Sequence, residues 1–302
     1  MKISTAGIYE VSATEYHADP CPEPSLSASI ATVLLADSPA HARHQHPRLN
    51  PFFQREEREM FDLGSAAHAY LLEGSSGFAI IDAPDWRTKA AKEERDAART
   101  EGRLPILRHK WDDILAMVEA VNRQLDDFRD LPRPFSDGKP EQTLVWKEGA
   151  VWCRARLDWL SNDHEVICDL KTTGASANPD QWTRQMFAGP DLQAAFYLRG
   201  VKTVTGKNAT LRFIVSENYT PYALSVISLG PPALVIAEKK VRLAIELWTQ
   251  CIESGQWPGY PTRTCYADLP PWEEARWLQR EEREIVDPTV NARGAFILGG
   301  RK

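Results

Sequence analysis

Apolar residues recur at helical spacing in several stretches of the first half of the chain. The segment SASIATVLLAD predicts a short apolar helix that begins near Ser27, and a second helix is expected from about Phe52 to Glu73. After a charged segment, residues 111–128 carry apolar side chains at intervals of three and four, which predicts a long amphipathic helix. The N-terminal half is therefore expected to be mainly helical.

The pattern changes after Pro140, where three short β-prone runs follow one another. TLVW, VWCRARLDWL and EVICDL are separated by KEGA and SNDH, which predicts a three-stranded antiparallel meander. A helical stretch over 178–200 with a break at Gly189, two more strands at ATLRFIVSE and YALSVISL, and a long helix over 232–254 are expected to follow. This order predicts a mixed α/β core in one domain, with a helical N-terminal elaboration.

The charge balance is acidic, with 36 Lys and Arg against 42 Asp and Glu and a formal net charge of −6. This excludes a generally cationic nucleic-acid coat protein, but it permits an enzyme with a local basic patch. Residues 86–110 hold eight basic and four acidic residues, and Arg87, Lys89 and Lys92 are candidates for non-specific phosphate contact. A solvated helix face of mixed charge is the alternative.

The five cysteines are widely spaced, odd in number and without a C-x-x-C pair. This argues against a disulfide framework, a structural zinc site and a cysteine-ligated iron–sulfur cluster, and predicts packed thiols at Cys153 and Cys168. Because the sequence has neither a signal-peptide pattern nor an apolar run of about 18 residues, we expect a cytoplasmic protein without membrane contact.

The candidate chemistry lies in the second and third runs of the meander. Side chains alternate along a strand, so Asp158 is expected to share a face with Arg154 and Arg156, and Asp169 with Lys171. The two arginines are then candidates for holding a nucleic-acid strand. The side chains expected to point the other way, into the core, are those of Leu157, Trp159, Val166, Cys168 and Leu170.

A turn centred on residues 162–163 makes Asp158 a diagonal cross-strand neighbour of Asp169. Two converging carboxylates repel each other unless a cation or a proton lies between them, and oxygen ligands favour Mg²⁺ or Mn²⁺ over zinc. Lys171 could position an attacking water and offset charge on a phosphate. Because D-x-K is a common tripeptide, a structural Asp pair beside a lysine is the alternative.

Three further features accompany this pair. Gly64 and His68 lie one helical turn apart, so the glycine permits close backbone approach while the imidazole could supply a ligand. Gln193 and Tyr197 have the same spacing on a later helix, where ordinary packing is the alternative. Glu141 opens the meander and is either a further carboxylate of the site or a solvated edge residue.

The motif order G-x-x-x-H, Asp, D-x-K and Q-x-x-x-Y resembles the RecB-like branch of the PD-(D/E)XK nuclease superfamily. GIYEVSATEYHAD, LSASIATVLLADSPAHARH, FDLGSAAHAYLLEG, WRTKAAK and WPGYP are similar to the exodeoxyribonuclease VIII (RecE-type) nuclease domain of phages and prophages, over about residues 7–262. The resemblance implies a PD-(D/E)XK core over 1–262. The remaining 263–302 form a partly helical tail to which no function is assigned.

The resemblance also implies roles for individual residues and a function. It makes metal ligands of His68, Asp158, Asp169 and the backbone carbonyl of Leu170, a catalytic lysine of Lys171, and supports for the site or the DNA of Gln193 and Tyr197. Leu157 replaces the proline of the superfamily name, a change that the RecB-like branch tolerates.

The implied activity is Mg²⁺-dependent 5′→3′ digestion of linear double-stranded DNA from its ends. A ring-like homo-oligomer and a single-strand annealing protein as partner in recombination are implied as well. The alternatives are a RecB-like endonuclease or single-strand nuclease with the same site, and a catalytically silent DNA-binding or phage assembly protein.

Overall fold

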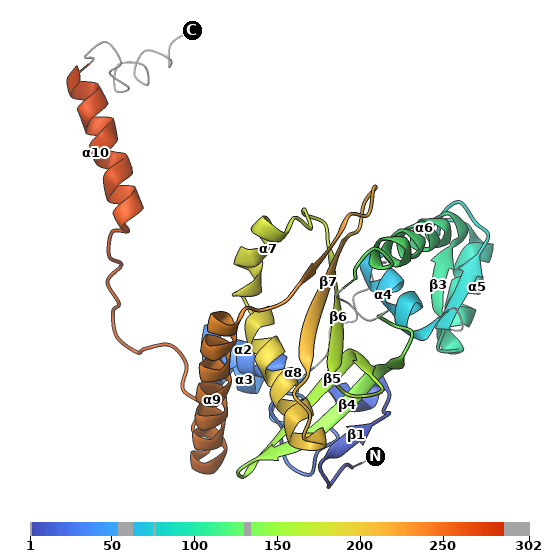
Figure 1. The fold of residues 1–302 in the computed structure, drawn as a ribbon, viewed down its shortest axis with the longest axis horizontal. Coiled ribbons are helices and arrows are strands. Elements are labelled where there is room, and N and C mark those ends of the chain that lie inside the picture. The colour runs from blue at the N-terminus through green and yellow to red at the C-terminus, as the bar shows by residue number, and fades with distance from the viewer. Residues whose placement is uncertain (1, 54–62, 75–76, 130–133, 287–302) are drawn as a thin grey trace. The chain divides into compact units, whose positions relative to one another are not determined.

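A six-stranded sheet in the order β1-β4-β5-β6-β7-β8 forms the centre of the molecule in the computed structural model, which describes residues 2–53, 63–74, 77–129 and 134–286 (Figure 1). Its strands are β1 (Gly7–Tyr9), β4 (Gly138–Glu148), β5 (Val151–Ser161), β6 (Val166–Thr173), β7 (Thr210–Glu217) and β8 (Leu224–Ile227). All neighbouring strands are antiparallel except β6 and β7. The predicted meander is therefore confirmed as β4, β5 and β6.

Helices cover both faces of this sheet, as Figure 1 shows for α8 on one side and α4 and α6 on the other. The helices of the main unit are α1 (Ala13–His17), α2 (Ala28–Ala36), α3 (Pro39–Gln45), α4 (Leu63–Glu73), α5 (Lys89–Thr100), α6 (Arg108–Leu125), α7 (Pro179–Met186), α8 (Pro190–Thr205) and α9 (Pro231–Ser254). The sheet residues Leu157 and Phe213 pack with α2, α8 and α9, whereas Trp159 and Ile214 pack with α4 and α6.

Local sequence signals explain most of the helix boundaries. The Ser27 hydroxyl accepts a hydrogen bond from the Ile30 N–H and caps α2, as the sequence predicts. The predicted break separates α7 from α8, where Gly189 has a φ of 143° and Pro190 opens the next helix. The helix predicted from Phe52 is wrong at its start, because Phe52 lies in a turn; residues 54–62 lie outside the described chain.

A small layer that the sequence did not predict follows α4. Strands β2 (Phe78–Ile81) and β3 (Leu104–Leu107) pair in parallel, and α5 connects them. The buried side of α5 consists of Ala91 and Ala98, so its apolar stripe is too small to stand out among the charged residues.

The chain divides into two compact units, Met1–Gly259 and Tyr260–Lys302. The second contains α10 (Pro271–Val286), on which Trp272, Trp277 and Leu278 are exposed. Within the described ranges no helix is long and apolar enough to cross a membrane.

Candidate active site

The candidate site lies where two strands of the central sheet part. Strand β5 pairs with β6 at Trp159–Cys168 and Leu160–Ile167, whereas β6 continues along β7 to Thr173. Further back along β5 the same edge is occupied by Leu26, whose N–H donates to the Trp152 carbonyl over 2.8 Å. Asp158 is the first residue of β5 beyond the paired segment, and it therefore faces the gap between the strands.

Strict alternation fails at this point. Trp159, Cys168 and Leu170 pack together on the α6 side as predicted, but Leu157 packs with Leu160 on the α8 side, so its predicted orientation is wrong. The side-chain pattern of β5 thus changes across Asp158, where the strand leaves β6.

The Asp158 carboxylate satisfies a backbone N–H of β6 at a point where β6 has no backbone partner on β5. Its Oδ2 accepts a hydrogen bond from the Leu170 N–H over 2.8 Å and lies 3.0 Å from Nε2 of His68 on α4. Burial raises the pKa of Asp158, but the hydrogen bond and charge of His68, together with the charge of Lys171 and the Leu170 N–H, outweigh burial, so this pKa is lowered. The pKa of His68 is raised, because Asp158 outweighs the effect of burial on the imidazole.

Glu141 completes a cluster of three potential metal ligands. One ligand atom each from His68, Glu141 and Asp158 lie within 4.8 Å of one another. The Glu141 carboxylate also accepts a hydrogen bond from Arg156, whose Nη1 donates to the Val11 carbonyl over 2.6 Å. Burial and the nearby Asp158 raise the pKa of Glu141. Arg156 thus neutralises the edge of the cluster.

Asp169 lies on the neighbouring strand and is only 1% exposed. It forms an ion pair with Lys171, and its Oδ1 accepts a hydrogen bond from Nε2 of Gln193 over 2.6 Å. Burial, and then the charge of Asp158, raise the pKa of Asp169 to about 6. Burial lowers the pKa of Lys171, but the two aspartates outweigh this effect, so the ammonium form is favoured.

Tyr197 lies one turn beyond Gln193 on α8 and hydrogen bonds with it. It is 8% exposed, and burial raises the pKa of its hydroxyl far above the ordinary value. A neutral, buried tyrosine fits a role in supporting Gln193 rather than one in proton transfer.

The structure brings most of the predicted residues together, and the donor set suits a hard divalent cation. Imidazole and carboxylate groups converge, and the pKa of Asp169 is raised by burial and by the charge of Asp158; a bound cation would offset that charge. The Leu170 N–H contacts Asp158, and the role of its carbonyl as a ligand stays a prediction.

Arg154 does not reach this gap. Its side chain is buried, with Nη1 2.8 Å from the Ser25 carbonyl and 3.3 Å from Oδ1 of Asp19. It therefore has no exposed surface to offer a DNA strand, and we assign it a structural role in place of the predicted DNA contact. No local signal announces this pairing, because Ser25 lies 129 residues earlier in the chain.

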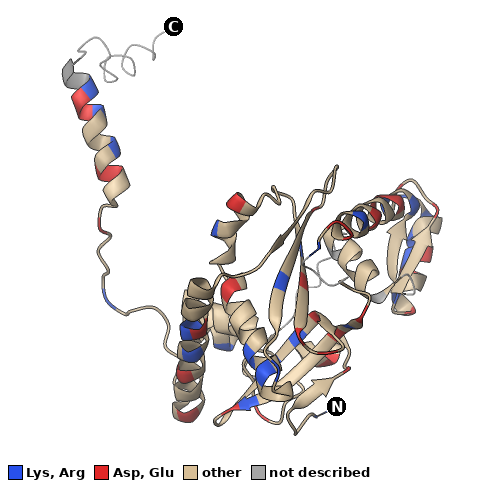
Figure 2. Cartoon of the chain, viewed as in Figure 1, with Lys and Arg blue, Asp and Glu red and all other residues tan. Residues whose placement is uncertain are grey.

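The predicted basic strip lies on and beside α5, where basic and acidic residues are interleaved (Figure 2). Arg87 and Lys89 have side chains that are 92% and 89% exposed, and each lies 3.6 Å from a neighbouring carboxylate. Lys92 is exposed as well. These residues are accessible to a phosphate backbone, and their contact with DNA stays a prediction.

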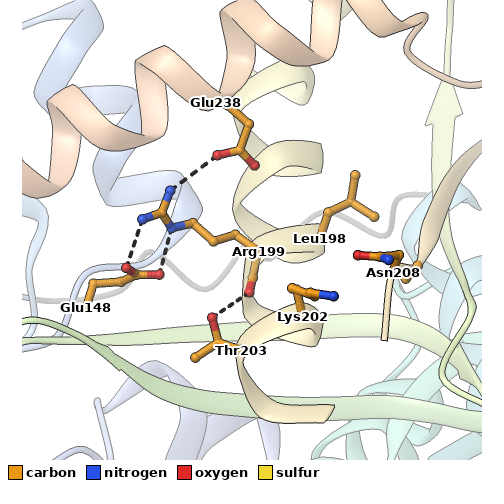
Figure 3. Close-up of a pocket in the computed structure, with 8 residues that line it drawn as sticks. Glu148, Leu198, Arg199, Lys202, Thr203, Asn208 and Glu238 are labelled. Atoms are coloured by element: carbon orange, nitrogen blue, oxygen red, sulfur yellow. Dashed lines mark hydrogen bonds and ion pairs between the residues drawn. The ribbon is translucent and has the colours of Figure 1, made fainter. Parts of the chain in front are cut away.

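A pocket of about 380 Å³ lies elsewhere, between the ends of β4, α8 and α9 (Figure 3). Arg199 crosses it and forms ion pairs with Glu148 and Glu238, and Trp146 also donates to Glu148. Its charges are thus neutralised within the pocket. None of the predicted site residues lines it.

Sequence reasoning missed the contact that sets the position of α4. A Cβ at Gly64 would lie 2.2 Å from Oγ1 of Thr172 on β6, so only glycine allows this approach. His68 follows one turn later and reaches Asp158 for this reason. The G-x-x-x-H spacing indicated a close approach, but nothing local identified Thr172 as the neighbour.

Comparison with known proteins places this geometry in a wider group. A family model described as "PDDEXK-like domain of unknown function (DUF3799)" matches residues 29–269, and no curated protein matches the chain. A candidate exonuclease from Eubacterium rectale shares the fold with a TM-score of 0.56 and 13% identity, over 87% of this chain and 97% of that chain. These findings confirm the predicted fold class.

Two further solved structures are less similar. SSO0001 has a TM-score of 0.33 and 10% identity, over 84% of this chain and 100% of that chain. An alkaline exonuclease (LHK-Exo) from Laribacter hongkongensis has a TM-score of 0.27 and 12% identity, over 63% of this chain and 95% of that chain. Likeness at this level carries no argument about function.

Proposed function

The chain belongs to the PDDEXK-like family DUF3799, and we propose that it is a divalent-metal-dependent DNA nuclease. The observation that carries the proposal is the convergence, at the parting of β5 and β6, of two groups of side chains. One is the cluster of His68, Glu141 and Asp158, and the other is the Asp169–Lys171 ion pair. A structural Asp pair would not need a half-buried lysine beside it together with a third carboxylate and an imidazole.

The carboxylates and the imidazole would hold Mg²⁺ or Mn²⁺. A bound ion supplies Lewis-acid polarisation of a phosphodiester. Asp158 and Asp169 offer oxygen ligands from adjacent strands, and the Leu170 N–H holds Asp158 in place. Gln193 fixes Asp169 from the opposite side through its 2.6 Å hydrogen bond. Both carboxylates are thus oriented before any substrate binds.

Lys171 acts as a cation in this proposal. Its pKa is raised by the two aspartates, so the side chain donates protons and cannot accept one at neutral pH. An ammonium in this position can offset charge that develops on the phosphate and can orient an attacking water by donating a hydrogen bond. Lys171 can play both roles while it stays in its ion pair with Asp169.

We further propose that the substrate is the end of linear double-stranded DNA and that digestion runs 5′→3′. The resemblance of the motif order to RecE-type nuclease domains supports this, as does a fold shared with a candidate exonuclease. A ring-like homo-oligomer, a single-strand annealing protein as partner and a role in phage-type recombination belong to the same proposal. They rest on the resemblance alone.

The test uses end-labelled linear duplex, nicked circle and covalently closed circle, each with and without Mg²⁺. We expect Mg²⁺-dependent loss of the linear duplex while the closed circle stays intact. Release of label from the 5′ end before the 3′ end would support the polarity. Cleavage of the closed circle would favour an endonuclease instead, and metal-independent digestion would contradict the proposal.

Two variants and two matched controls locate the chemistry. Lys171→Ala and Asp169→Asn are expected to abolish cleavage while circular dichroism shows a retained fold. Lys239→Ala on α9 and Asp268→Asn in the second unit remove the same charges at exposed positions, and they should cleave as wild type does. Full activity in the first two variants would refute the assigned site.

A further inference from the structure

Helix α7 connects the two residues that hold Asp169. Lys171 lies two residues before the end of β6, and Gln193 lies one turn into α8, so α7 is the chain between them. Strand and helix rises place Lys171 about 7 Å from the end of β6 and Gln193 about 4.5 Å from the start of α8. Helix α7 is therefore held at both of its ends by segments that contact Asp169, which makes it a candidate for contact with a strand that leaves the proposed centre.

Most of the surface of α7 is exposed. Trp182 and Met186 anchor the helix in the core, one turn apart. At 100° per residue Arg184 points away from this buried pair, and Phe187 follows one turn later with 49% of its surface exposed. Within the described residues no carboxylate lies within ion-pair distance of the Arg184 guanidinium.

A second exposed aromatic residue lies at the same end of β6. Tyr219, which is 42% exposed, hydrogen bonds with Glu217 of β7, the register partner of Thr173. The Glu217 carboxylate also accepts a hydrogen bond from the Ala177 N–H over 2.9 Å, which ties the approach to α7 to this strand. The Glu217 carboxylate thus contacts both Tyr219 and the segment that leads into α7.

We propose that Arg184, Phe187 and Tyr219, here called the α7 platform, bind unpaired nucleotides of the strand that is cleaved. Exposed aromatic rings stack on bases, and an unneutralised arginine contacts phosphate, which together form the chemistry of single-strand binding. Bases within a duplex stack on each other and leave no face for these rings. The platform therefore selects single-stranded nucleic acid next to the catalytic centre, an inference that rests on the proposed nuclease function.

The first test measures binding of the full chain to a fluorescein-labelled oligothymidylate and to a blunt duplex, by anisotropy in the presence of a chelator. Phe187→Ala and Tyr219→Ala should each weaken binding of the single strand about 5- to 150-fold, with no change for the duplex. Arg184→Ala should make the salt dependence of single-strand binding shallower by about 0.7 in the log–log slope.

Two further variants separate stacking from a merely structural effect. Phe187→Trp keeps an aromatic face and should restore single-strand binding. Tyr266→Ala removes an aromatic ring that is 89% exposed in the second unit, and it should bind both ligands as wild type does. Equal losses on duplex and single strand, or no loss on either, would overturn the platform.

The kinetic test distinguishes this inference from the function on which it rests. Phe187→Ala should raise KM for a single-stranded substrate more than it lowers kcat. A wild-type protein that cuts DNA, with a Phe187→Ala variant of unchanged KM, refutes the platform and leaves the nuclease standing. A wild-type protein that cuts no DNA in Mg²⁺ refutes the proposed function, and the platform fails with it.

Discussion

Replacing Gly64 by alanine should separate α4 from the sheet and weaken metal binding. The added Cβ would lie 2.2 Å from Oγ1 and 2.6 Å from Cβ of Thr172, whereas ordinary contacts begin at about 3.4 Å. Helix α4 must therefore move by about 1 Å. His68 lies one turn further along the same helix, so its 3.0 Å contact with Asp158 would lengthen beyond hydrogen-bond distance.

The expected stability change is the difference between two opposing effects. Overpacking costs about 1–3 kcal/mol. Alanine in place of a helical glycine returns up to about 1 kcal/mol through its higher helix propensity. The Gly64→Ala variant should therefore lose up to about 3 kcal/mol of unfolding free energy. Displacement of His68 should reduce Mn²⁺ affinity about 10- to 100-fold, as loss of a supporting contact at a metal site does.

Urea unfolding and Mn²⁺ titration calorimetry measure these two quantities on the full chain. Adding Thr172→Ala to Gly64→Ala should restore part of the unfolding free energy and part of the Mn²⁺ affinity. The second substitution removes Oγ1 of Thr172 but leaves a Cβ at this position. The control is Gly77→Ala, where an added Cβ meets open space. A Gly64→Ala variant with wild-type stability and wild-type Mn²⁺ affinity would refute the argument that this close approach positions His68.

The remaining predictions concern pH, a buried ion pair and the basic strip. Because the folded pKa of Asp169 is raised to about 6, the folded chain holds this proton more tightly than the unfolded chain, and stability without metal falls as pH rises from about 4 to about 6. Mg²⁺ competes with that proton, so its stabilising effect in thermal unfolding should grow over the same range; a pH-independent Mg²⁺ effect would contradict this. Arg154→Met leaves the buried Asp19 with only His46 and Arg48 as basic neighbours and should cost at most about 3–5 kcal/mol in urea unfolding, with recovery in the double variant that also carries Asp19→Asn. Arg87→Ala combined with Lys89→Ala should weaken DNA binding and make its log–log salt slope shallower by about 2, and an unchanged slope would remove α5 from the path of the DNA.

The sequence predicts those parts of the site whose residues lie close together along the chain, and it does not predict the contacts between distant segments. Asp158 and Asp169 could be placed together because a short turn joins their strands. The predicted register is wrong by two residues, because Trp159 pairs with Cys168 and Asp158 is therefore aligned with Asp169 directly rather than diagonally. The environment of Arg154 could not be predicted, because Asp19 comes from a distant loop. The orientation of Leu157 was wrong because strict alternation fails at Asp158, where the β4–β5 ladder lacks the Glu141–Asp158 pair and Glu141 has a φ of 55°. Sequence periodicity carries no signal for where strands part.

The parting of β5 and β6 also explains why the acidic site and the fold support each other. A strand that loses its neighbour leaves backbone N–H groups without partners, which is costly in a buried region. At Leu170 the N–H is satisfied by the Asp158 carboxylate, so the side chain proposed to bind metal also closes the sheet. The resulting excess negative charge is confined to this gap, where Arg156 and Lys171 offset part of it. A net charge of −6 is therefore compatible with a polyanionic substrate, since the acidic groups of the site are partly or fully buried and partly neutralised, and exposed cations are present on α5 and α7.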